Sequence, residues 1–366
     1  MREALALCRR WEAEGKQVVV ATLVAVGGST PRRAGARLLV SSGGQTSGSV
    51  SFGCVEADVA AHAREVLETS TPRLAAYGIS DEDAFAVGFS CGGTMEVFIE
   101  PWNHLADLLG GVPGEAFVGA LATVIAGLES GTHGLFDVAT GRSTGDLSPA
   151  LTGALREDAS TVVDAEQARL IRHDDAAVFV EPVLPAPRLV VYGAGHAAQA
   201  LSAAGAAVGF RVTVCDHRPG LLSPESYPEA VDILAGWPDE LVPRLALDSR
   251  TFVVVLSHNP EIEDLLLPPL LSTDIAYVGV LGSKRTHAAR VQRLTDAGLS
   301  GEQIARMHAP VGLDIGAVTP EEIAASIVAE LVGVRRKRLS IRETARQNPA
   351  SGTSRELPVT VFEGSR

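Results

Sequence analysis

Short apolar runs separated by glycine-rich turns dominate the first half of the chain. Residues 18–26 form a valine-rich run typical of a buried strand. Apolar positions recur at helical spacing over residues 55–67, whereas residues 95–100 alternate like a half-buried strand. The other elements predicted here are an amphipathic helix over 1–15, a hairpin of 37–41 with 46–50, and a strand near 116–125. No internal repeat is evident in this pattern.

The second half alternates between predicted strands and helices. A strand over 189–192 runs through a glycine turn into an alanine-rich helix over 197–208, and a strand over 211–215 completes a βαβ unit. Three more strands are predicted over 231–234, 252–256 and 276–281. A last helix begins after Thr319 with the pattern of a capping box and extends to about Arg336. This order of elements predicts a doubly wound parallel sheet.

The pattern therefore predicts an α/β protein with two domains, which suits a chain of 366 residues. Three prolines within residues 182–187 favour extended backbone and predict a linker. The expected organisation is an N-terminal α/β domain over 1–181, a Rossmann-like domain over 188–340 and a loose polar tail over 341–366.

Composition and charge exclude several classes of function. A net charge of −13 argues against a general nucleic-acid or anionic-membrane surface, so any anion site must be local. The N-terminus lacks the apolar core of a secretory signal, and the run over 18–26 is too short to span a membrane. A cytoplasmic protein is expected. The four cysteines show neither CxxC nor zinc spacing and predict reduced thiols.

A glycine turn in the second half is a candidate nucleotide site. Gly193 and Gly195, followed by Ala198, form a G-x-G-x-x-A pattern between a strand and a helix, where backbone N–H groups can approach a pyrophosphate. Asp216 ends the next strand, where a carboxylate can bind ribose hydroxyls. Arg218 can instead accept a phosphate, so NAD and NADP stay open, as does a Rossmann fold without a nucleotide.

An arginine-rich loop is the second candidate. Arg32, Arg33 and Arg37 lie among small residues, where guanidinium groups and exposed N–H groups suit a phosphate or another oxyanion. The alternative is a surface loop whose arginines pair with nearby carboxylates.

Two cysteines lie beside small residues at predicted element boundaries. Cys54 comes at or near a helix N-terminus, whose positive end favours a thiolate that can bind a soft metal. Cys91 lies next to Gly92 and Gly93. The alternative for Cys54 is a small buried apolar residue, which is the usual role of a free cysteine.

Taken together, the motifs resemble those of the XdhC/CoxI family, the xanthine dehydrogenase accessory factors. In the first half the matching residues are Gly28-Ser29-Thr30-Pro31-Arg32, Gly48-Ser49-Val50-Ser51, Gly53-Cys54-Val55-Glu56-Ala57 and Cys91-Gly92-Gly93. In the second half they are Tyr192-Gly193-Ala194-Gly195-His196, Cys215-Asp216-His217-Arg218, Leu281-Gly282-Ser283-Lys284-Arg285 and the run 308–317. The resemblance extends in order to about Arg336.

The resemblance implies a chaperone that binds molybdenum cofactor, holds it while a cysteine desulfurase sulfurates it, and delivers it to a molybdenum hydroxylase of the xanthine dehydrogenase type. The pterin phosphate would suit Arg32, Arg33 or Arg37, and Cys54 would suit the metal. A homo-oligomer is expected. The alternatives are an NAD(P)-dependent oxidoreductase and a sulfur-transfer enzyme that uses Cys54.

The sequence departs from the family pattern at two positions. Phe52 stands where the family usually carries a glycine, and its side chain is expected to block close backbone approach or to forbid a positive φ. Asn259 stands where an acidic residue commonly follows the histidine, which weakens an acid–base or metal role there.

Overall fold

The chain, seen here in a computed structural model that describes residues 2–30, 32–78, 93–112 and 116–346, divides into two compact units, Met1–Pro185 and Ala186–Arg366. Pro182 and Val183, expected in the linker, instead end strand β10 (Ala176–Val183). Pro182 is tolerated because β10 pairs with β9 only over Ala176–Val180, so its missing N–H faces no partner strand there.

Two five-stranded antiparallel sheets form the first unit, with orders β3-β2-β1-β5-β4 and β8-β7-β6-β10-β9. The first contains β1 (Val18–Gly27), β2 (Arg37–Ser41), β3 (Thr46–Gly48), β4 (Arg73–Tyr77) and β5 (Thr94–Pro101). The second contains β6 (Gly119–Ala126), β7 (His133–Asp137), β8 (Ser143–Gly145), β9 (Arg169–His173) and β10. The helices are α1 (Arg2–Ala13), α2 (Glu56–Thr69), α4 (Asn103–Gly110), α5 (Pro149–Ala154) and α6 (Arg156–Ala165).

The two sheets are copies of one topology, so the expectation of no internal repeat is wrong. Residues 97–101 read Val-Phe-Ile-Glu-Pro in β5, and residues 178–182 read Val-Phe-Val-Glu-Pro in β10. The registers agree as well, because Val20 of β1 pairs with Glu100, and Leu121 of β6 pairs with Glu181. The repeat has no fixed period in the sequence, because its loops differ in length. Residues 28–36 connect β1 to β2, whereas residues 127–132 connect β6 to β7.

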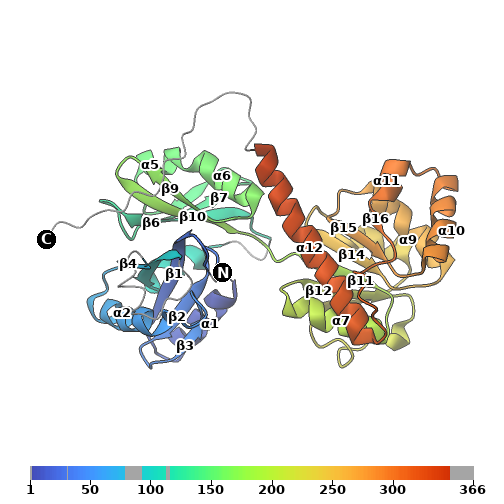
Figure 1. Cartoon of the computed structure of the whole chain (residues 1–366), viewed down its shortest axis with the longest axis horizontal. Coiled ribbons are helices and arrows are strands. Elements are labelled where there is room, and N and C mark those ends of the chain that lie inside the picture. Colours follow the sequence, from blue (N-terminus) through green and yellow to red (C-terminus); the bar gives the residue numbers. More distant parts are fainter. Residues whose placement is uncertain (1, 31, 79–92, 113–115, 347–366) are drawn as a thin grey trace. The chain divides into compact units, whose positions relative to one another are not determined.

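The two sheets face each other, with α2 on the outer side of the first and α5 and α6 on the outer side of the second (Figure 1). Between them lies an apolar cluster in which matching residues of the two copies meet. It contains Val24, Phe98, Ile125, Ala177 and Phe179. The region 103–177, where the sequence predicts only one strand, therefore forms α4, α5, α6 and most of the second sheet.

The second unit has a six-stranded parallel sheet of order β13-β12-β11-β14-β15-β16, as expected for a Rossmann-like fold. Its strands are β11 (Arg188–Tyr192), β12 (Arg211–Asp216), β13 (Ala230–Ala235), β14 (Thr251–Val255), β15 (Tyr277–Val280) and β16 (Met307–His308). Its helices are α7 (His196–Ala207), α8 (Pro238–Leu241), α9 (Pro260–Ser272), α10 (Lys284–Asp296), α11 (Gly301–Ala305) and α12 (Pro320–Arg346), with short 3₁₀ turns at Pro219–Leu221 and Val242–Leu245. Helices α7 and α12 cover one face, and α8 to α11 pack against the other (Figure 1).

Helix α12 begins at the expected capping box, in which the Thr319 hydroxyl accepts from the Glu322 N–H and the Glu322 carboxylate accepts from the Thr319 N–H. It continues to Arg346, so residues 341–346 are helical rather than part of a loose tail. The residues after Arg336 are mostly good helix formers, with no glycine or proline before Pro349. The rest of the expected tail, 347–366, lies outside the described residues.

Candidate functional site

The arginine loop, residues 28–36, connects β1 to β2 and is closed by backbone hydrogen bonds at its ends. The Leu23 N–H donates to Ala36 O and the Gly35 N–H donates to Leu23 O, both at 2.8 Å. Gly93 lies against the start of this loop, because a Cβ there would be 2.5 Å from Ser29 O. Cys91 itself lies outside the described residues, but the glycine two positions after it is needed for this close approach.

The cysteine loop, residues 49–55, is wrapped around one carboxylate. Glu56, the first residue of α2, accepts from the Ser49 hydroxyl at 2.6 Å, from the Ser51 N–H at 2.8 Å and from the Gly53 N–H at 2.7 Å. The Val50 N–H and the Ser51 hydroxyl donate to it as well. Partial burial raises the pKa of Glu56, but the hydrogen bonds from the serines outweigh it and lower this pKa to about 2.

Glu56 has no assigned role in the sequence argument, although a signal for it exists. An acidic residue in the first turn of a predicted helix is favoured by the positive helix N-terminus, and Glu56 opens α2 directly after the glycine-containing loop whose N–H groups it accepts. Its ionised carboxylate fixes the loop that carries Cys54, so it is a structural part of the candidate site.

Phe52 has a φ of +61°, so the expectation that this residue forbids a positive φ is wrong. The residue is 68% exposed and does not fold back into the core. Instead, the Arg32 guanidinium carbon lies 4.9 Å from the centre of the ring, within the range of a cation–π contact. Phe52 thereby joins the arginine loop to the cysteine loop.

The three predicted arginines have different environments. Arg37 forms an ion pair with Glu181 of the second sheet, and the two side chains are only 9% and 7% exposed. Its predicted role as a phosphate ligand is therefore replaced by a structural one, because its charge is already neutralised inside the unit. Arg32 is half-buried and Arg33 exposed, and within the described ranges neither forms an ion pair.

The second copy lacks these features. Its corresponding loop, residues 127–132, contains no arginine. Counting from the matching glycines Gly48 and Gly145, the place of Cys54 is taken by the buried Leu151, and that of Glu56 by Gly153. Because the two copies share strands and registers, the residues that distinguish the first copy are not required for the fold.

Cys54 is a free thiol, half-buried beside the apolar core under α2. Cys8 and Cys215 are also free but fully buried, and desolvation raises the pKa of each to about 12. In the part of the chain that the structure describes, no three His, Cys, Asp or Glu side chains are arranged to hold a metal ion.

The glycine turn of the second unit connects β11 to α7 as the sequence predicts. Gly193 and Gly195 have φ values of +113° and +138°, and the space where a Cβ of Gly195 would lie is open. Asp216 is 1% exposed and accepts from the Ala194 N–H at 2.6 Å and from Nε and Nη2 of Arg218, each at 2.9 Å.

These contacts correct the expectation for Asp216. Burial raises the pKa of Asp216, but the hydrogen bonds from Arg218 and from the Ala194 N–H outweigh it and lower this pKa. With both oxygens engaged, Asp216 holds the glycine turn and Arg218 and is not free for ribose hydroxyls. The Arg218 side chain itself is 54% exposed.

Asn259 is the N-cap of α9, and its side chain accepts from the Glu261 N–H at 3.0 Å. This capping role explains why a short polar residue fits there without acid–base chemistry.

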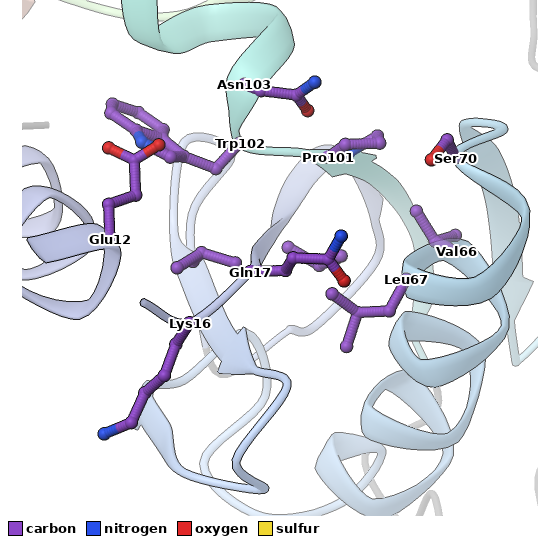
Figure 2. Close-up of a pocket in the computed structure, with 11 residues that line it drawn as sticks. Glu12, Lys16, Gln17, Val66, Leu67, Ser70, Pro101, Trp102 and Asn103 are labelled. Atoms are coloured by element: carbon purple, nitrogen blue, oxygen red, sulfur yellow. The ribbon is translucent and has the colours of Figure 1, made fainter. Parts of the chain in front are cut away.

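Figure 2 shows a small cavity near the start of β1, whereas the two loops follow the ends of β1 and β3. It has a volume of about 220 Å³ and is lined by residues from the end of α1, the start of β1, the end of α2 and the end of β5. Trp102 lines it, and the indole N–H of this residue is buried with no hydrogen-bond partner among the described residues. None of the arginines or cysteines discussed above lines this cavity.

Comparisons with known proteins match both units. The XdhC and CoxI family model matches residues 11–78, and the XdhC Rossmann domain model matches residues 189–331. The chain is 30% identical to a probable subunit of xanthine dehydrogenase from Bacillus subtilis, over 88% of this chain and 94% of that protein. It is 28% identical to the molybdenum cofactor insertion chaperone PaoD of Escherichia coli, over 88% of this chain and 84% of PaoD.

Among solved structures, a protein described as a xanthine dehydrogenase of Bacillus halodurans is similar, with a TM-score of 0.75 and 25% identity. The match covers 91% of this chain and 96% of that one. In the described ranges of this chain, every helix is too short or too polar to cross a lipid bilayer.

Proposed function

Since the chain belongs to the XdhC and CoxI family, we propose that it is an accessory protein that binds molybdenum cofactor and delivers it to a molybdenum hydroxylase. The observation that carries the proposal is the pair of loops in the first unit. They bring a free thiol and two arginines that form no ion pair within the described residues to one end of a sheet, whereas the corresponding loop of the second copy, residues 127–132, contains neither an arginine nor a cysteine.

In this proposal Arg32 and Arg33 bind the pterin phosphate. The chain as a whole carries a net charge of −13 and would repel a phosphate, whereas two guanidinium groups with no ion pair among the described residues can bind it by charge-assisted hydrogen bonds. Cys54 is the protein ligand for molybdenum, since a soft thiolate suits the metal of a dithiolene complex. Cys91 is a second candidate ligand, because its neighbour Gly93 lies against the arginine loop.

A binding experiment tests this function. The purified chain is incubated with cofactor released from a molybdoenzyme, and the retained pterin is measured by fluorescence after gel filtration and oxidation. Replacing Arg32 and Arg33 together by alanine should weaken binding at least about ten-fold, because each charge-assisted hydrogen bond contributes about 1.5–3 kcal/mol. Arg142→Ala, at an exposed arginine of the second copy, is the matched control.

Failure of the unmodified chain to retain pterin would refute the function, and unchanged affinity of the double variant would refute the site. We also propose that a cysteine desulfurase sulfurates the bound cofactor before delivery. Mass spectrometry after incubation with desulfurase and cysteine separates this from sulfur transfer by the protein. Only a carrier would show Cys54 heavier by one sulfur atom.

For the second unit we propose nucleotide binding at the glycine turn, with Arg218 as the phosphate ligand. The open space at Gly195 beside the first turn of α7 favours this role, because helix N-termini bind phosphates. Calorimetry with NAD and NADP tests it. Arg218→Ala should weaken the binding of NADP more than the binding of NAD. If the unmodified chain binds neither nucleotide, the proposed nucleotide site is refuted and the Rossmann-like fold stands without it.

A further inference from the structure

Phe52 is unusual in two independent respects. It is a bulky residue with a left-handed backbone, a conformation that favours glycine, and it is 68% exposed to solvent. Its side chain makes a cation–π contact with Arg32. Neither the strained backbone nor the exposed ring benefits the core, so the contact with Arg32 is the feature that distinguishes phenylalanine from glycine at this position.

The loop around Phe52 holds its backbone in place. The Phe52 N–H donates to the Ser49 hydroxyl at 2.7 Å, and the same hydroxyl donates to Glu56 at 2.6 Å. The next residue, Gly53, donates to the other oxygen of Glu56 at 2.7 Å. Because the Phe52 N–H is tied to Glu56 through Ser49 and the Gly53 N–H is tied to it directly, the backbone at Phe52 is fixed and the Cβ of Phe52 leaves the cysteine loop at a defined place.

Arg32 needs such a support. Among the described residues it forms no ion pair, and its loop contributes one further contact, from the Thr30 hydroxyl to the Arg32 carbonyl at 3.1 Å. A long unpaired arginine on a glycine-rich loop samples many rotamers, and fixing it on binding costs conformational entropy. A ring beneath the guanidinium restricts these rotamers and leaves its N–H groups in the plane free to donate.

We propose that Phe52 is a positioning residue, which holds the Arg32 guanidinium beside the Cys54 loop so that it binds the phosphate of the cargo. The proposal rests on the proposed function for the identity of the cargo, but the stacking can be measured without it. It also predicts a specificity: the contribution of Phe52 is confined to cargo that carries the phosphate, because Phe52 acts only through Arg32.

The first experiment is independent of cargo. The Arg32 Nε–H resonance of the full chain, assigned with Arg32→Lys, should show a ring-current shift that disappears in Phe52→Leu, which keeps an apolar side chain without a π-system. A resonance that is unchanged in Phe52→Leu would overturn the proposal, whether or not the chain binds molybdenum cofactor.

The second experiment uses molybdenum cofactor and the same cofactor after phosphatase treatment. An exposed cation–π contact contributes about 0.5–1 kcal/mol, so Phe52→Leu and Phe52→Gly should each raise the Kd for phosphorylated cofactor about two- to five-fold. The Kd for dephosphorylated cofactor should not change. Added to Arg32→Ala, Phe52→Gly should cause no further loss, because the effect of the ring passes through Arg32.

A structural role predicts a different pattern. If Phe52 only supported the loop, Phe52→Gly would lower the melting temperature and would weaken the binding of phosphorylated and dephosphorylated cofactor equally. This result would overturn the proposal. We expect the melting temperature of Phe52→Gly to stay constant or rise, since glycine adopts a positive φ freely. Equal affinity of the unmodified chain and Phe52→Leu for phosphorylated cofactor would also overturn it, leaving the proposed function intact.

Discussion

Glu181→Gln should unfold the first unit at a markedly lower temperature, because it leaves the Arg37 charge buried without a partner. The two side chains are 9% and 7% exposed, and the pair joins β2 of the first sheet to β10 of the second. Removing one partner of a buried ion pair costs about 3–5 kcal/mol. A unit of this size loses about 2–4 °C of melting temperature per kcal/mol, so the expected decrease is roughly 6–20 °C.

The assay is thermal unfolding of the full chain, followed by circular dichroism at neutral pH. Two controls distinguish the effect of leaving Arg37 without a partner from the effect of removing a carboxylate. Replacing Arg37 and Glu181 together by leucine should recover most of the stability, since apolar residues often substitute for a buried ion pair without loss. Glu100→Gln affects the equivalent pair with the two copies exchanged, in which Glu100 of β5 contacts His133 of β7 at 2.7 Å. Glu100→Gln should lower the melting temperature less than Glu181→Gln, because the glutamine amide can still form a hydrogen bond with Nε2 of His133.

This experiment also separates the two roles considered for Arg37. A Glu181→Gln protein with an unchanged melting temperature, together with weaker cofactor binding by Arg37→Ala, would refute the structural role and return Arg37 to the phosphate site. A large decrease in stability for both single variants would support the structural role.

Three other predictions concern single residues. Limiting iodoacetamide at neutral pH should label Cys54 before Cys8 and Cys215, because the latter two are fully buried and their pKa values are raised to about 12. Peptide mapping that finds Cys8 labelled first would contradict the structure. Because the pKa of Glu56 is lowered from 4.5 to about 2, its contribution to stability is complete above about pH 4.5 and is lost as the pH falls towards 2. The Gly53 amide resonance should therefore titrate near pH 2, and a midpoint near pH 4.5 would mean that the carboxylate does not hold the loop. Trp102→Phe should lower the free energy of unfolding by less than about 1 kcal/mol in urea titrations, since removing a buried N–H that has no partner among the described residues offsets part of the lost packing. A loss above about 3 kcal/mol would contradict this account of the N–H.

Sequence patterns located most of the elements correctly where local signals are strong. In the second unit the βαβ unit, the glycine turn and the capping box at Thr319 follow from hydrophobic period and local chemistry alone. The position of Cys54 near the start of α2 is confirmed for the same reason. The duplication in the first unit is not apparent from such signals, because its identity is confined to short strand segments separated by loops of unequal length.

The sequence by itself determined the residue types at the candidate site, the glycines that permit its turns, and the parallel sheet of the second unit, since these depend on neighbours along the chain. Tertiary structure alone decided which arginine side chains are neutralised by an ion pair. Arg32 and Arg37 lie in the same short segment, yet one rests on an exposed ring and the other is neutralised by Glu181, 144 positions away. Long-range pairing of this kind depends on how the two sheets meet, and no local pattern encodes it.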